Sequence, residues 1–375
     1  MREARLPAQL GLPKTNEIEV HMKRFFIISL FLFAALLSGC AQTAPDLPED
    51  AGGPDPLPAE LTFSEDVFSH SRSSPDAVCY SWLDAQMHQF CVDDANAVFF
   101  ASDPIVSSTD DEHGSHSVYT ATGASGARLI MEYNSVSMQS LYYCTPWYVS
   151  KAELLVRDYP ADTGAFGMNN VDELPREELA FAAARDAEAA VKEALERLGC
   201  GNIGAAEVYS LSPATLAALE QDYPRRGDQG EYLPPQSWTE EDTCYYLRFR
   251  CEYGGLVFSR EDCGTDITAY YSARGMERLE IRTPLEVTGT GEKIEMPSAE
   301  DAKAMVTRKY DSIILTDDLT VEEISLEYAI APGGGKLVPS WRVIISETIV
   351  SEELGEFQNR FCIRFDALTG KQMTQ

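Results

Sequence analysis

A short apolar stretch near the N-terminus sets where the folded part of this chain can begin. The apolar run 25–37 follows a Met-Lys-Arg start and ends in Leu37-Ser38-Gly39-Cys40. A basic start, a short apolar run and small residues before a cut site are the three parts of a secretory signal peptide. The run is shorter than the roughly 20 residues that a helix needs to cross the hydrocarbon core of a membrane. We therefore expect residues 22–39 to direct export and then to be removed.

The end of this stretch matches the bacterial lipobox. In proteins with this motif, the sulfur of the cysteine receives diacylglycerol and the peptide is cleaved before it, here between Gly39 and Cys40. Two acyl chains, such as palmitate, hold a protein stably at a membrane, whereas one chain alone binds reversibly. We therefore expect a lipoprotein anchored through Cys40 to the outer, extracytoplasmic face of the cell membrane. The alternative is an ordinary signal peptide with a chance cysteine, or an uncleaved anchor.

Two segments around the signal are not expected to contribute to the fold. Met22 lies where a signal peptide should begin, so residues 1–21 are interpreted as a mis-assigned upstream start. Residues 40–60 are interpreted as the lipidated cysteine and a disordered linker, because they are rich in proline and acidic side chains and lack aromatic residues. At about 3.1 Å per residue, this linker can hold a folded domain about 60 Å from the membrane.

The charge of the chain excludes several kinds of partner. It carries 30 Lys and Arg against 60 Asp and Glu, a formal net charge of −30. This balance argues against nucleic acid as a partner and against a second, electrostatic contact with anionic lipids. A surface charged for solubility is the simplest interpretation, and a surface adapted to a cationic ligand is the alternative. The apolar fraction of 44% is ordinary for globular proteins.

Cysteine and histidine residues indicate no metal or cofactor site. The run from Asp110 to His116 contains two imidazoles and three carboxylates, but polar runs with a glycine are more often solvated loops. Export permits disulfides, but no cysteine pair has Cys-x-x-Cys spacing, so disulfide bridges and buried free thiols both stay possible. The sequence does not indicate an oligomeric state. The cysteines after Cys40 are Cys79, Cys91, Cys144, Cys200, Cys244, Cys251, Cys263 and Cys362.

Residues 61–222 are expected to form a first α+β unit. A helix is predicted between Pro175, which suits a first helical turn, and Gly199, which suits a helix stop. A shorter helix is predicted over residues 212–222, with Ser212 as its cap. The apolar stripe of the longer helix consists of Leu179, Ala183, Ala187, Val191, Ala194 and Leu198. The candidate strands are Met87–Val92, Ala97–Ala101, Ser117–Tyr119, Ala127–Tyr133 and Met138–Cys144.

Residues 223–243 are rich in Pro and Gly and are interpreted as a linker loop, so that residues 244–375 form a second unit. Ser298 and Asp301 predict a capped helix that begins there. The candidate strands of this unit are Cys244–Cys251, Leu256–Ser259, Ile267–Ser272, Arg278–Thr283, Glu323–Ile330, Trp341–Ile349 and Arg360–Asp366. The predicted fold is therefore α+β, with two tandem units that each pack one or two helices on an antiparallel sheet.

Several passages resemble a known but uncharacterised family. The helix 176–199, the segment 246–259 with its Tyr-Gly-Gly-Leu-Val, and Leu337-Val338-Pro339-Ser340-Trp341 resemble lipoproteins of Gram-positive gut bacteria that share a domain of unknown function. The ending 365–371, Phe-Asp-Ala-Leu-Thr-Gly-Lys, is similar to PepSY-type modules, although Gly254-Gly255 replaces their commoner Gly-x-Pro. The resemblance covers most of residues 80–373. The resemblance implies an accessory role beside a membrane protein or enzyme. It provides no catalytic residue that could be carried over to this chain.

No catalytic motif stands out in the sequence. Gly-x-Ser-x-Gly and His-Glu-x-x-His do not occur, and the acidic pairs Glu240-Glu241 and Asp317-Asp318 are typical of helix starts or solvated loops. We expect a non-catalytic accessory, regulatory or protein-binding module whose partner is a membrane or cell-surface protein. Capture of a small ligand or solute is the alternative and requires an apolar pocket. An extracytoplasmic hydrolase is a further alternative and requires a carboxylate or Ser/His constellation in a cleft.

Overall fold

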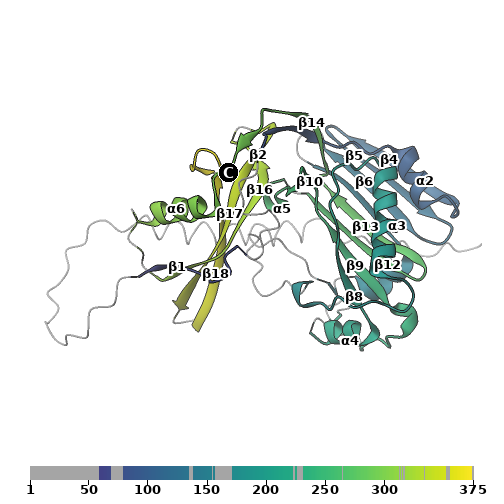
Figure 1. Ribbon diagram of the computed structural model, residues 1–375. Coiled ribbons are helices and arrows are strands. Elements are labelled where there is room, and N and C mark those ends of the chain that lie inside the picture. The colour runs from purple at the N-terminus through teal and green to yellow at the C-terminus, as the bar shows by residue number, and fades with distance from the viewer. Residues whose placement is uncertain are drawn as a thin grey trace, which may run out of the picture. The chain divides into compact units, whose positions relative to one another are not determined.

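A computed structural model describes the C-terminal five-sixths of the chain (Figure 1). The described residues are 59–373 apart from 69–78, 135–137, 154, 157–170, 223, 226–230, 264, 312, 314, 316, 333 and 352–354. The predicted upstream start, signal peptide and lipidation site Cys40, together with the linker as far as residue 58, lie outside these residues. None of the described helices is long and apolar enough to cross a membrane.

The first of two large sheets has eight strands, all antiparallel, in the order β4-β5-β6-β7-β13-β12-β9-β8. β4 and β8 are its edges, and β7 pairs with β13 at its centre. The strands are β4 Ile105–His113, β5 His116–Gly123, β6 Arg128–Asn134, β7 Met138–Cys144, β8 Glu207–Leu211, β9 Cys244–Phe249, β12 Asp266–Ser272 and β13 Gly275–Arg282.

The second sheet has seven strands and includes β17, the longest strand that the structure describes. Its main path is β1-β16-β17-β18-β19, and β3 joins it by pairing with both β14 and β17. β1 is parallel to β16, and the other neighbours are antiparallel. The strands are β1 Leu61–Phe63, β3 Leu83–Met87, β14 Leu285–Thr290, β16 Leu319–Ile330, β17 Lys336–Ser351, β18 Gly355–Asp366 and β19 Gln372–Met373.

Five α-helices and two small two-stranded sheets complete the described fold, which confirms the predicted α+β class. β10 (Glu252–Tyr253) pairs with β11 (Leu256–Val257), and β15 (Ile294–Glu295) pairs with β2 (Cys79–Tyr80). The helices are α2 Val92–Phe99, α3 Ala184–Arg197, α4 Pro213–Asp222, α5 Arg260–Cys263 and α6 Ala299–Tyr310. Short π- and 3₁₀-helical turns lie at Tyr148–Ala152, Val171–Glu173 and Glu240–Asp242.

The predicted division into two tandem units at residues 223–243 is wrong. β8 lies before this segment and β9 after it, yet the two strands pair, with Val208 opposite Leu247. β7 and β13 also pair across the predicted boundary, and β1 and β3 join the sheet of C-terminal strands. Pro58–Gln375 is accordingly one compact unit. A loop-like composition indicates where a chain turns, whereas strand pairing depends on matching faces far apart in the sequence.

The helix predicted between Pro175 and Gly199 is present as α3, but it begins later than predicted. α3 begins at Ala184 rather than near Pro175 and ends before Gly199, whose φ of 77° is the left-handed conformation that stops a helix. Ala187 and Val191 of the predicted stripe are fully buried, and α3 packs against β9 and β12 (Figure 1). α4 and α6 begin where predicted. Ser212 accepts a hydrogen bond from the Thr215 N–H, and Ser298 forms a capping box with Asp301.

The region before β5 differs from the prediction. Residues 97–101 were predicted as a strand, but α2 runs to Phe99, with acidic side chains in its first turn and Ala95 buried. β3 ends at Met87, so most of the predicted strand 87–92 is also wrong. Short apolar runs fit either a strand or a helix, which explains this error. β4 was not predicted at all, because its sequence is polar.

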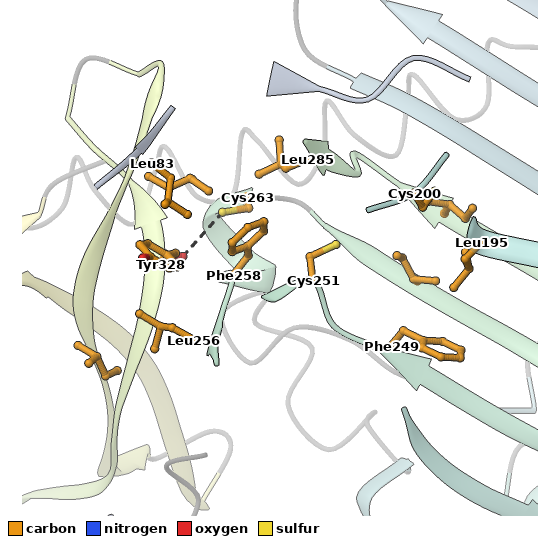
Figure 2. Close-up of a cluster of buried hydrophobic side chains, with 14 of the residues drawn as sticks. Leu83, Leu195, Cys200, Phe249, Cys251, Leu256, Phe258, Cys263, Leu285 and Tyr328 are labelled. Carbon is orange, nitrogen blue, oxygen red and sulfur yellow. Dashed lines mark hydrogen bonds between the residues drawn. The ribbon is translucent and has the colours of Figure 1, made fainter. Parts of the chain in front are cut away.

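A buried cluster connects β16 of the second sheet to the segment that follows β9 of the first (Figure 2). The Tyr328 ring meets the Phe258 ring edge-on at 5.8 Å, and the Ser259 N–H donates to the Tyr328 carbonyl at 2.7 Å. The Cys263 thiol points to the same carbonyl at 3.8 Å. The two sheets therefore contribute to one core.

Candidate functional site

Buried charges on the eight-stranded sheet are paired with one another. Glu207 on β8 lies opposite Arg248 on β9, and both are less than a tenth exposed. The Arg248 Nε donates to Glu207 at 2.7 Å, and the Tyr209 hydroxyl donates to the same carboxylate at 3.1 Å. This carboxylate is part of a buried ion pair that joins β8 to β9.

An arginine on the same sheet is enclosed by tyrosine rings. The Arg278 guanidinium lies 5.4 to 5.9 Å from the ring centres of Tyr142, Tyr148 and Tyr270, which is cation–π distance. It donates to the Thr268 hydroxyl at 2.9 Å and pairs with Glu280. Burial raises the pKa of the Tyr270 hydroxyl well above its ordinary value. The cluster joins β7, β12 and β13.

A second buried ion pair lies on the seven-stranded sheet. Arg364 on β18 donates to Glu327 on β16 at 2.9 Å and to the Ser259 hydroxyl at 2.9 Å. Arg364 alternates with Ile363 and Phe365 along β18 and therefore points to the opposite face of the sheet. Arg364 is nevertheless buried, because the ion pair satisfies its charge.

The two acidic pairs singled out in the sequence serve local structure. Glu240 and Glu241 lie in the short helix 240–242, where Thr239 and Asp242 form a capping box. Asp318 accepts a hydrogen bond from the Glu60 N–H at 2.9 Å. The two pairs lie on different parts of the chain, and neither forms a carboxylate pair across a cleft.

Asp242 is the most strongly bound of these acids. Burial by itself raises its pKa, but hydrogen bonds from Lys151, Trp147 and Thr239 outweigh this effect and lower the pKa to about 2. The Lys151 Nζ lies 2.6 Å and the Trp147 Nε1 3.0 Å from the same carboxylate oxygen. Asp242 therefore ties the start of β9 to the segment after β7.

The Asp110–His116 run is a β-hairpin rather than the solvated loop expected for it. Its acidic residues belong to β4, Gly114 turns the chain with a φ of 65°, and His113 lies opposite His116. Within the described ranges, no three His, Cys, Asp or Glu side chains are grouped as a metal would require.

The described cysteines are free thiols. Cys79 and Cys91 are exposed, Cys362 is half-buried, and the other five are buried. Burial raises the pKa of Cys200 and of Cys251 to about 12, so these thiols are unreactive at neutral pH.

A hollow of about 330 Å³ lies between α2, α3 and the sheet. In it, the Phe99 ring stacks on the Tyr143 ring with centres 4.4 Å apart. Arg197 of α3 and Arg274, in the turn before β13, add positive charge. Arg197 donates to the Ala97 carbonyl at 3.0 Å, while Arg274 is held by Glu277. These residues could not be grouped from the sequence, because they come from four segments, one of which was predicted as a strand.

Comparison with known proteins gives the fold without an activity. No family model and no curated protein matches the chain. The structure is similar to the crystal structure of an uncharacterized protein from Eubacterium rectale, a Gram-positive gut bacterium, with a TM-score of 0.57 and 15% sequence identity over 84% of this chain and 90% of that chain. The chain thus shares an α+β fold with a gut bacterial protein of unknown role. The lipoprotein family and the PepSY-like ending stay predictions.

Proposed function

We propose that this protein is a membrane-anchored extracytoplasmic lipoprotein whose folded part binds another protein at the cell surface and catalyses no reaction. The observation that supports a binding role is the pairing of buried charge. Buried carboxylates such as Glu207 and Glu327 contact arginines on other strands of the same sheet. These acids stabilise the sheets instead of pointing into a cleft, where hydrolysis would require them.

The linker and the surface charge support the same proposal. A flexible linker sets the reach and local concentration of a bound domain but adds no specific contact. Specificity must then come from the folded part, whose strong negative charge favours a partner with basic patches. Because the Debye length falls from about 10 Å at 0.1 M salt to about 3 Å at 1 M, such an association weakens as salt rises.

Crosslinking on intact cells tests this proposal. The full-length protein is crosslinked, its partner is identified by mass spectrometry, and the purified pair is titrated in a salt series. We expect one surface or membrane protein whose affinity falls with salt. The opposite outcome is hydrolysis of a glycan, peptide or ester by the purified protein, abolished by a single acidic or serine substitution. That result would make the protein an enzyme.

Capture of a small ligand is the second candidate, and the hollow beside α3 favours it. Stacked aromatic rings with Arg197 and Arg274 nearby suit a small, flat carboxylate. Calorimetry with benzoate tests it, with Arg197→Gln as the variant and Arg185→Gln, exposed on the same helix, as the control. Capture predicts binding that Arg197→Gln abolishes and Arg185→Gln preserves. Absence of heat at millimolar benzoate excludes this ligand class.

A further inference from the structure

The hairpin strand β4 is exposed along its whole length. Each of its nine residues, Ile105–His113, is exposed on the face of the sheet to which it points. β4 is also an edge, since it pairs with β5 alone (Figure 1). Edge strands expose unpaired N–H and C=O groups, and proteins usually shorten or cover them. An open edge of this length therefore offers a template for another strand.

The pairing with β5 shows which backbone groups face outward. His113 lies opposite His116 across a two-residue turn, which is a hydrogen-bonded pair. Hydrogen-bonded and non-hydrogen-bonded pairs alternate from there, so Glu112, Asp110 and Ser108 direct their N–H and C=O groups to the open edge. The part of the chain that the structure describes supplies no partner for these groups.

The two ends of β4 differ in chemistry. At its start, Ile105 and Val106 are 38% and 65% exposed, and few other large apolar side chains of the described residues are exposed. At its end, Asp110, Asp111 and Glu112 alternate between the two faces of the sheet. No described salt bridge involves these three carboxylates.

We propose that β4 binds an extended segment of the partner protein, which adds to the sheet as an antiparallel strand and carries basic side chains opposite Asp110–Glu112. This inference rests on the proposed protein-binding function and specifies its surface. Backbone hydrogen bonds to the open edge supply affinity, and the side chains of the added strand supply specificity. The apolar side chains of the added strand then cover Ile105 and Val106.

A basic strand is favoured over a second copy of this chain. Each copy carries a formal net charge of −30, so two copies repel as they approach. A basic strand instead gains from the acidic end of β4 and places its charges on both faces of the sheet.

Two peptides of equal charge test the backbone contact. The probe is a peptide of three lysines followed by alternating threonine and valine, so that antiparallel addition places the lysines opposite Asp110–Glu112. The control peptide has the same sequence with alternate amides N-methylated. The full-length protein in detergent micelles should bind the control about tenfold or more weakly, because the methyl groups remove the hydrogen bonds. Hydrogen exchange should slow at residues 105–113 when the unmethylated peptide binds.

Two variants test the strand itself. Ser108→Pro removes an outward N–H without removing a bond to β5, and should weaken binding of the probe about tenfold. The second is a triple variant that combines Asp110→Asn, Asp111→Asn and Glu112→Gln, and it keeps the test possible if Ser108→Pro does not fold. It should bind the probe more weakly, and that binding should depend less on salt. The control variant neutralises three exposed carboxylates elsewhere, Glu292, Glu295 and Glu300, and should bind as the unchanged protein does.

Several outcomes would overturn the assignment. These are no binding of the probe, equal binding of the two peptides, exchange protection away from residues 105–113, or a dimer that Ser108→Pro separates. If the partner crosslinked on cells binds Ser108→Pro and the triple variant as tightly as the unchanged protein, β4 is not the surface, although the protein-binding function stands. If cells yield no partner, the proposed function fails whatever the peptide does.

Discussion

At the level of single residues, the buried carboxylate of Asp242 shows how a charge inside this protein stabilises the fold. Asp242 accepts hydrogen bonds from three side chains, and its pKa of about 2 lies below the ordinary aspartate value. A depressed pKa means that the charged form is favoured by folding. The stabilisation is therefore complete above about pH 4 and is lost as the pH falls towards 2.

This gives a pH-dependent prediction for Asp242→Asn. The urea midpoint of the variant should lie below that of the unchanged protein at pH 6, and the difference should shrink between pH 4 and pH 2. Glu240→Gln, an exposed neighbour in the same turn, serves as the control and should show little difference at any pH. A difference for Asp242→Asn that is the same at pH 6 and pH 2 would contradict the assigned role.

Trp341 shows what one core residue contributes. It is 4% exposed on β17, between Leu326 on β16 and Phe365 on β18. Trp341→Ala should destabilise the protein by about 3–5 kcal/mol, because the cavity left behind adds to the lost burial. Trp341→Phe should cost less, since the indole Nε1 has no hydrogen-bond partner among the described residues. An unchanged urea midpoint for Trp341→Ala would mean that this side chain is exposed and available for binding.

At the level of helices and strands, local sequence patterns predicted an element correctly where they reflect a defined interaction, such as a helix cap. The Ser298–Asp301 capping box predicted the start of α6, and the predicted strand Arg360–Asp366 lies within β18. The signals failed where composition was ambiguous, as in the apolar run that ends α2. They also failed for β4, where a hairpin polar on both faces has no alternation to detect.

Strand pairing across residues 223–243 leads to a prediction about cleavage. A specific protease site inserted within residues 226–230 should be cut without separating the fragments, because β8–β9 and β7–β13 pair across the cut. The two fragments should elute together in size-exclusion chromatography and separate only in denaturant. Two folded fragments that separate in native buffer would restore the two-unit prediction.

At the scale of the whole molecule, the sequence predicted the fold class better than it predicted how the strands are ordered within the sheets. The α+β class and most helices and strands follow from periodicity and caps, which act over a few residues. The mixing of early and late strands in both sheets, as with β3 beside β17, depends on contacts hundreds of residues apart. The hollow lined by Phe99, Arg197 and Arg274 could not be predicted for the same reason.

The proposed lipid anchor is central to the proposed function, because attachment at Cys40 would place the folded part at the cell surface. Metabolic labelling with a palmitate analogue measures it directly, comparing the unchanged protein with Cys40→Ser and with Cys79→Ser, whose cysteine is exposed in the folded part. We predict label on the unchanged protein and on Cys79→Ser, and none on Cys40→Ser, which should accumulate as the uncleaved precursor. Label that persists on Cys40→Ser would contradict the lipoprotein assignment.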